Sequence, residues 1–214
     1  MWRVPGPERA FLAFAVAVAV FQNVPAVLPE GDLVDVATPF AVIGASALVL
    51  LALRARGRAL GLAVLAGITY TSGQSIHLAA NSIADERPAG RVAEVAYFWD
   101  ERFGHIWWHL GWLGLLAACC LAERAAAPSR SWRLEARHAA TALLLAFTLF
   151  TNTVEGQTWW LGLGVGALFC AWAARERRPL LVTCALAFAL NALFIAVWAI
   201  WHGGVPQFSD LGLV

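Results

Sequence analysis

Long apolar runs separated by short polar connections fill most of this chain. Crossing the hydrocarbon core of a bilayer takes about 20 apolar residues as an α-helix, because every backbone polar group must be hydrogen-bonded within the segment. The runs of suitable length cover residues 9–28, 34–53, 59–83, 94–121, 138–154, 158–174 and 180–201. We therefore predict an all-α fold, a polytopic transmembrane helical bundle of about seven spans.

The connections between these runs are too short to hold a soluble domain. Of the 214 residues, 60% are hydrophobic and 14% are charged, whereas about 25% of the residues of soluble domains are charged. We expect a single transmembrane domain over residues 1–214. Its expected partners are the lipid bilayer and a lipid-like substrate, and no nucleic acid.

Arginine is distributed unevenly between the two ends of the predicted spans. Basic residues close to span ends stay on the cytoplasmic side of a membrane. With the N-terminus inside, 12 arginines are cytoplasmic, and only Arg87, Arg91 and Arg102 are outside. Ten of the 14 acidic residues lie on the outer side or at the outer span ends. An odd number of spans then places the C-terminus outside, and we expect the protein in the plasma (cytoplasmic) membrane.

The first run has a second interpretation, as a cleaved signal peptide, because Arg3 and Arg9 precede an alanine- and valine-rich segment. Residues 24–28 hold no small-x-small cleavage site. This absence favours a membrane anchor.

Cysteine and lysine usage excludes two classes of protein. The four cysteines fall in the cytoplasmic halves of the predicted spans, where the compartment is reducing, so no disulfide framework is expected. The chain has no lysine. A retinal Schiff base, which needs a lysine amine, is therefore excluded despite the seven runs.

Polar residues inside the third and fourth runs gather toward the outer side of the membrane. In the third run they recur at spacings of four, three and four residues, which places them on one helical face. They are Tyr70, Gln74, His77 and Asn81. The fourth run carries Glu101, His105 and His109 at spacings of four. Because ionisable groups at the centre of a span are unfavourable by about 2.5–3.5 kcal/mol, these stripes indicate a functional site.

Two histidines four residues apart converge on one side of a helix and can bind one metal ion. We therefore predict a metal site formed by His77, His105 and His109, between the outer interface and the midplane. Asp100 and Glu101 are the predicted catalytic groups, as proton shuttle or as partner of a metal ligand. The alternative is that these side chains only hydrogen-bond to one another across helices.

Three other polar residues have simpler interpretations. His202, beside Gly203, is expected at the membrane interface, and Glu155 is expected to be a solvated turn acid. His138 lies at the cytoplasmic end of its run and is left out of the site.

A histidine late in one run, an aspartate early in the next and an HxxxH pair resemble the alkaline ceramidase and adiponectin-receptor superfamily of intramembrane zinc hydrolases. The resemblance covers these residues only. It implies zinc bound by His77, His105 and His109, with Asp100 nearby, and hydrolysis of an amide. In that family the HxxxH pair belongs to the last span, whereas here it lies in the fourth. One turn before its first histidine the family has a serine, where this chain has Gly73.

Three functions follow as hypotheses. The leading one is an enzyme, a zinc-dependent intramembrane hydrolase of a lipid-like amide or ester, in which zinc lowers the pKa of its bound water to about 7 and polarises a carbonyl. The second is a haem- or metal-binding protein for electron transfer or metal handling, because histidines on facing helices can bind haem axially. The third is a non-catalytic membrane subunit whose polar stripes hold helices together.

The arginine distribution predicts how the two termini react in intact cells. With 12 arginines inside and 3 outside, an N-terminal tag should be protected from a membrane-impermeant reagent and a C-terminal tag should be labelled. Lysed cells, in which both tags must react, are the control. A C-terminal tag that is labelled only after lysis would contradict the predicted orientation.

Overall fold

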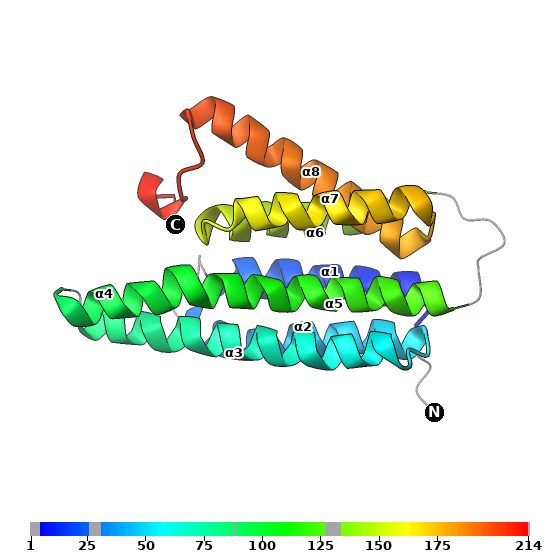
Figure 1. Cartoon of the computed structure of the whole chain (residues 1–214), viewed down its shortest axis with the longest axis horizontal. Helices are drawn as coiled ribbons and strands as arrows, with labels where there is room; N and C mark the ends of the chain where they lie inside the picture. Colours follow the sequence, from blue (N-terminus) through cyan, green and yellow to red (C-terminus); the bar gives the residue numbers. More distant parts are fainter. Residues whose placement is uncertain (1–4, 26–30, 88, 127–133, 214) are drawn as a thin grey trace.

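Helices account for nearly all of the structure, a computed structural model that describes residues 5–25, 31–87, 89–126 and 134–213. Apart from the tilted α8, the helices run almost parallel to the long axis of the molecule (Figure 1). No β-strand occurs in these residues. The all-α prediction is confirmed for this part of the chain.

Seven long helical segments make up the described residues, one for each predicted run. α4, the π-helical turn η2 and α5 form one continuous segment. The elements are α1 (Pro7–Asn23), α2 (Gly31–Ala52), α3 (Arg58–Glu86), α4 (Arg91–Tyr97), η2 (Phe98–Gly104), α5 (His105–Ala125), α6 (Ala136–Glu155), α7 (Trp159–Arg175), α8 (Pro179–His202) and the short 3-10 turn η3 (Ser209–Leu211).

Three of these segments are long and apolar enough to cross a membrane: Val34–Ala52, Arg91–Ala125 and Pro179–His202. α1 and α7 contain 17 residues each, slightly fewer than the usual span of about 20. α3 and α6 are long enough but carry more polar side chains. Membrane-spanning length and composition are therefore confirmed for three helices, and the count of seven spans stays a prediction.

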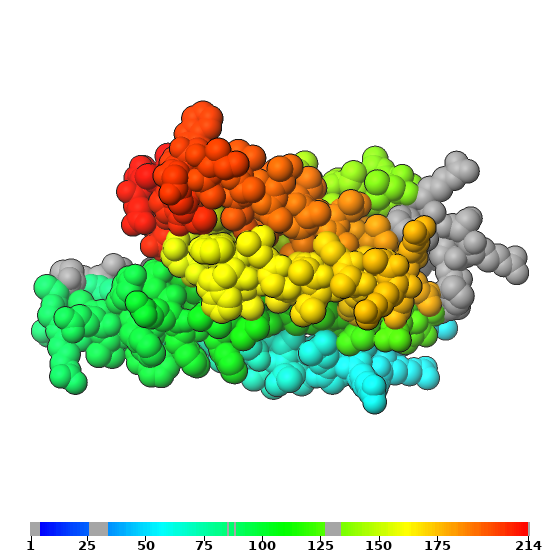
Figure 2. Space-filling view, turned by 45° about the horizontal axis from the view of Figure 1, so that its top comes forward, coloured from blue at the N-terminus to red at the C-terminus, as the bar shows by residue number. Residues whose placement is uncertain are grey.

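α3 and the α4–α5 segment form an antiparallel pair whose tip extends beyond the other helices (Figure 1). α1 packs against both α2 and α6, so it links the α2–α3–α5 side of the bundle to the α6–α7–α8 side. The end of α8 that carries His202 diverges from α6 and α7 (Figure 1). The C-terminal segment, residues 203–213, turns back beneath this end of α8 (Figure 1). Figure 2 shows the C-terminal segment packed against the bundle.

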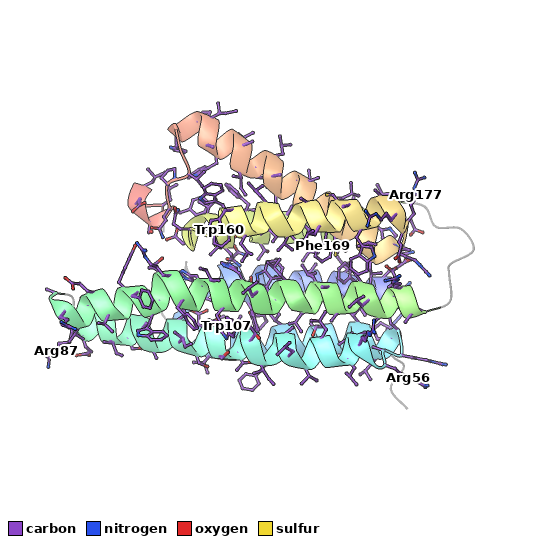
Figure 3. The ribbon with its side chains drawn as sticks, viewed as in Figure 1. Arg56, Arg87, Trp107, Trp160, Phe169 and Arg177 are labelled. Carbon is purple, nitrogen blue, oxygen red and sulfur yellow. The ribbon has the colours of Figure 1, made fainter. Side chains whose placement is uncertain are left out.

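The arginines that were predicted to be cytoplasmic gather at one end of the bundle, here called the basic end. Figure 3 shows Arg56 and Arg177 at this end and Arg87 at the other, here called the site end. Arg3, Arg130 and Arg133 lie outside the described residues. The bundle therefore separates charge along its axis as predicted, and which end is cytoplasmic stays a prediction.

The α3–α5 pair is held together through glycines. A methyl group placed at Gly111 would lie 2.3 Å from the backbone nitrogen of Tyr70, and one at Gly73 would lie 2.4 Å from that of Trp108. Small residues let helix backbones approach in this way, and van der Waals packing of this kind is a main source of helix association in membranes. The contact leaves no room for any side chain.

Gly111→Ala should therefore destabilise the protein by about 1–3 kcal/mol, because the new methyl group forces the two backbones apart. Thermal unfolding of the detergent-purified protein measures this effect. Gly164→Ala in α7 is the matched control, since a methyl group there meets nothing within 4 Å. It should be neutral or stabilising by up to about 1 kcal/mol, because alanine is the better helix former. Equal effects of the two substitutions would contradict the close contact.

Candidate metal centre

Three metal-binding side chains converge where α3, η2 and α5 meet. Ligand atoms of His77, Asp100 and His105 all lie within 4.8 Å of one another. The Nδ1 atom of His77 is in direct contact with the Oδ1 atom of Asp100, and the rings of His77 and His105 have centroids 4.9 Å apart. Asp100 and His105 are buried, and His77 is half-buried. The structure thus brings together three of the five residues predicted for the site.

The π-helical turn decides which acid joins the histidines. In a regular α-helix Glu101 shares the face of His105, one turn away. In η2 the chain makes a wider turn, and the backbone N–H of His105 donates to the carbonyl of Asp100, five residues earlier. Asp100 therefore lies on the histidine face. Turns of this kind occur frequently at functional sites.

Glu101 lies at the edge of this cluster. Its Oε2 atom is 3.4 Å from the Nδ1 atom of His105 and 3.4 Å from the side-chain nitrogen of Gln207, which donates to it. The Nδ1 atom of His105 is buried and has no hydrogen-bond partner among the described residues. With no hydrogen bond and only the Glu101 carboxylate 3.4 Å away, this imidazole nitrogen is available to a metal ion or to a proton.

His109 lies deeper than the other histidines. Its side chain is fully buried, its Nδ1 atom is 2.8 Å from the hydroxyl oxygen of Thr158, and its ring stacks on Trp108 with centroids 5.1 Å apart. Its ring centroid is 6.2 Å from that of His105. His109 therefore neighbours the centre but is not part of the group of three whose ligand atoms converge.

A polar cavity of about 290 Å³ opens beside the centre. His77 and His105 form one wall. The other walls include side chains of α1, α2 and α6 that the sequence analysis did not assign to the site: Gln22, Asn23, Asp35, Thr151, Asn152 and Glu155. Each lies near the end of an apolar run, and this shared position at the site end was the available signal for them.

The C-terminal segment borders this cavity through Phe208. The Oε2 atom of Glu155 accepts the backbone N–H groups of Phe208, at 2.7 Å, and Ser209, at 3.3 Å. The ring of Phe208 lines the cavity and packs against Phe150 and Trp198, with centroids 5.6 and 4.8 Å away. Glu155 is therefore an anchor for the chain end, and its predicted role as a solvated turn acid is too simple.

The two remaining histidines lie away from the candidate centre. His138 is at the basic end, where its Nδ1 atom accepts the backbone N–H of Glu135 in a capping box at the start of α6. His202 ends α8, is exposed and packs against Trp198. Neither belongs to the candidate metal centre.

No family model, curated protein or solved structure matches this chain. The donor set itself limits the chemistry. Two imidazoles and one carboxylate are ligands of catalytic Zn²⁺ sites, which keep a further position open for water or substrate, and of non-haem Fe²⁺ sites.

Glu155→Ala should release the C-terminal segment, because hydrogen bonds to a charged acceptor contribute about 1.5–3 kcal/mol each. Chymotrypsin should then cleave after Phe208 at least about tenfold faster than in the wild-type protein. Glu94→Ala, an exposed acid in α4 at the same end, is the control and should leave the rate unchanged. Equal cleavage of the wild-type and Glu155→Ala proteins would show that the aromatic contacts of Phe208 hold the segment without Glu155.

Proposed function

We propose that this protein is a metal-dependent intramembrane hydrolase of a lipid-like amide or ester, with its metal centre at His77, Asp100 and His105. The observation that carries this proposal is the convergence of three buried or half-buried donors within 4.8 Å. Ionisable groups among apolar helices are costly, so three of them on facing helices favour a functional role. Zinc is the proposed metal, as in the intramembrane hydrolases that the motif resembles.

The bound metal would supply a Lewis acid and a water molecule acidic enough to act as a nucleophile. The protein's side chains would bind the metal, balance its charge and move protons. His77 and His105 would bind as neutral imidazoles, and Asp100 would balance charge. Glu101, 3.4 Å from His105, is placed to orient that imidazole or to move a proton. His109 would stay a supporting residue held by Thr158.

We place the centre in the outer half of a seven-span bundle, with the N-terminus and the basic end in the cytoplasm. The support is the gathering of arginines at one end of the helices, opposite the metal centre. The host membrane is proposed to be the plasma membrane.

A lipid-like substrate is supported by an apolar groove of about 590 Å³ between α6 and α8. Phe150 and Trp198 line this groove, and both contact Phe208, which lines the polar cavity on its other side. An acyl chain in the groove would thus contact residues that pack on Phe208, which itself lines the polar cavity beside the metal centre.

A haem site is less well supported than a single metal ion. The rings of His77 and His105 are only 4.9 Å apart, and the cavity of 290 Å³ is at the lower limit of the about 300–1,000 Å³ usual for cofactor pockets. A macrocycle would need more space.

A non-catalytic membrane subunit is the second candidate, favoured by the hydrogen bonds that join the helices. Gln22 of α1 donates to the hydroxyl of Tyr70, at 3.0 Å, and accepts from Asn152 of α6. Gln74 of α3 donates to Asp35 of α2, at 3.2 Å. These groups hold helices together as interhelical hydrogen bonds commonly do. The two candidate functions differ in whether the cluster of His77, Asp100 and His105 binds a metal ion.

Metal analysis of the detergent-purified protein tests the proposed centre. The wild-type chain should retain about one zinc ion per protein. His77→Ala, His105→Ala and Asp100→Asn should each weaken zinc binding by more than about 100-fold. Mutating a residue that only supports a metal ligand already lowers metal affinity by about 10–100-fold, and losing a ligand should cost more. Glu101→Gln should weaken it by about 10–100-fold.

Two further histidine variants make the result specific. His138→Gln, at the basic end, should keep the metal and is the matched control. His109→Ala tests whether Asp100 or His109 is the third zinc ligand beside His77 and His105. Retained zinc supports Asp100 as the third ligand. Lost zinc with an unchanged unfolding temperature supports a site of three histidines. A wild-type protein without stoichiometric metal, together with His105→Ala protein of unchanged stability, would overturn the proposal in favour of the non-catalytic subunit.

A further inference from the structure

A second cavity, of about 450 Å³, lies at the basic end of the bundle, opposite the metal centre. The starts of α1 and α8, the end of α5 and the first turn of α6 surround it. Its charged lining consists of Glu8, Arg9, Glu123, Arg137 and Arg178, and apolar residues including Leu53 and Leu180 complete it. Charged and apolar groups together suit an amphiphile.

The two acids in this lining are already engaged. The carboxylate of Glu123 is buried and accepts the backbone N–H groups of Leu180, at 2.9 and 3.1 Å, and Leu181, at 3.2 Å. Glu8 pairs with the Nη2 atom of Arg137. Among the described residues, neither acid therefore forms an ion pair with Arg9 or Arg178.

The arginines keep unused donors. Glu8 and Glu135 both contact the Nη2 atom of Arg137, whereas its Nε atom is buried without a hydrogen-bond partner among the described residues. Among the described residues, the guanidinium group of Arg178 donates only to main-chain carbonyls, at 3.3 and 3.4 Å. Arg9 is exposed, and within the part of the chain that the structure describes neither Arg9 nor Arg178 has an acid within ion-pair distance.

Helix polarity adds to this positive charge. α1, α6 and α8 all begin at this cavity, and the N-terminus of each carries a partial positive charge of about half a unit. α8 is capped by Glu123, whereas α1 begins at Pro7 with no side-chain cap. Orphan N–H groups at helix starts are donors for anions.

The geometry points to a binding site for the phosphate group of an anionic membrane lipid, held by Arg9, Arg137 and Arg178 between the starts of α1, α6 and α8. Basic pockets between helices at the cytoplasmic ends of spans bind such head groups. The apolar lining beside the arginines favours a lipid over a free anion, because it would contact the glycerol and the first acyl carbons. This inference rests on the membrane placement of the bundle and does not depend on the metal centre.

Native mass spectrometry of the full chain in detergent tests this site, with dioleoylphosphatidylglycerol as the anionic probe and dioleoylphosphatidylcholine as its neutral match. The wild-type protein should bind the anionic lipid at least about fivefold more tightly. Arg9→Gln and Arg178→Gln should each remove about a factor of five, the effect of one arginine on an anionic lipid. Arg56→Gln, at the same end but outside the cavity, should leave binding unchanged.

Unfolding temperatures are measured in parallel because Arg178 also bonds to the end of α5. Within the described part of the chain Arg9 makes no such contact, so Arg9→Gln should fold normally and keep the test decisive. Equal binding of the two lipids, or equal losses in Arg9→Gln and Arg56→Gln, would overturn the site. Displacement of the anionic lipid by millimolar inorganic phosphate would overturn the lipid assignment in favour of a free phosphate ion.

Discussion

At Gly73 and Gly111 the backbones of α3 and α5 lie so close that no side chain fits between them. Inside a bilayer the hydrophobic effect does not drive helices together, so such packing supplies much of the association energy. The contact also sets the rotation and depth of both helices. His77 lies on α3 opposite Gly104, and its imidazole therefore meets Asp100 and His105. The candidate metal centre is built on this one helix pair.

The π-helical turn η2, together with the glycine contact, sets which side chains meet at the candidate metal centre. It adds a residue to one turn of a long helix, and this local change turns Asp100 toward the histidines while Glu101 moves to the edge. The two acids thereby acquire different surroundings. Asp100 is buried against an imidazole, and Glu101 keeps contact with the C-terminal segment through Gln207. Different surroundings for adjacent carboxylates permit different chemical roles.

The charged side chains at the two ends of the bundle have different partners. At the site end, the carboxylate of Glu155 accepts backbone N–H groups of the chain end, and Phe208 of that chain end lines the polar cavity and packs against Phe150 and Trp198 of the apolar groove. At the basic end, Glu123 caps α8, and Glu8 and Glu135 pair with Arg137, so among the described residues Arg9 and Arg178 have no acid within ion-pair distance. One end is therefore arranged around imidazoles and carboxylates, and the other around guanidinium groups.

The sequence by itself determined the all-helical fold and the near limits of its seven helical segments, because helical hydrogen bonds are local and long apolar runs permit little else. It also indicated His77, Asp100 and His105, since ionisable residues inside such runs are few. It did not show that Asp100 rather than Glu101 faces the histidines, because a π-helical turn is invisible to α-helical periodicity. Only the tertiary structure decided that His109 pairs with Thr158 and that Glu155 anchors the chain end, since these contacts join residues 49 and 53 positions apart, which packing alone brings together.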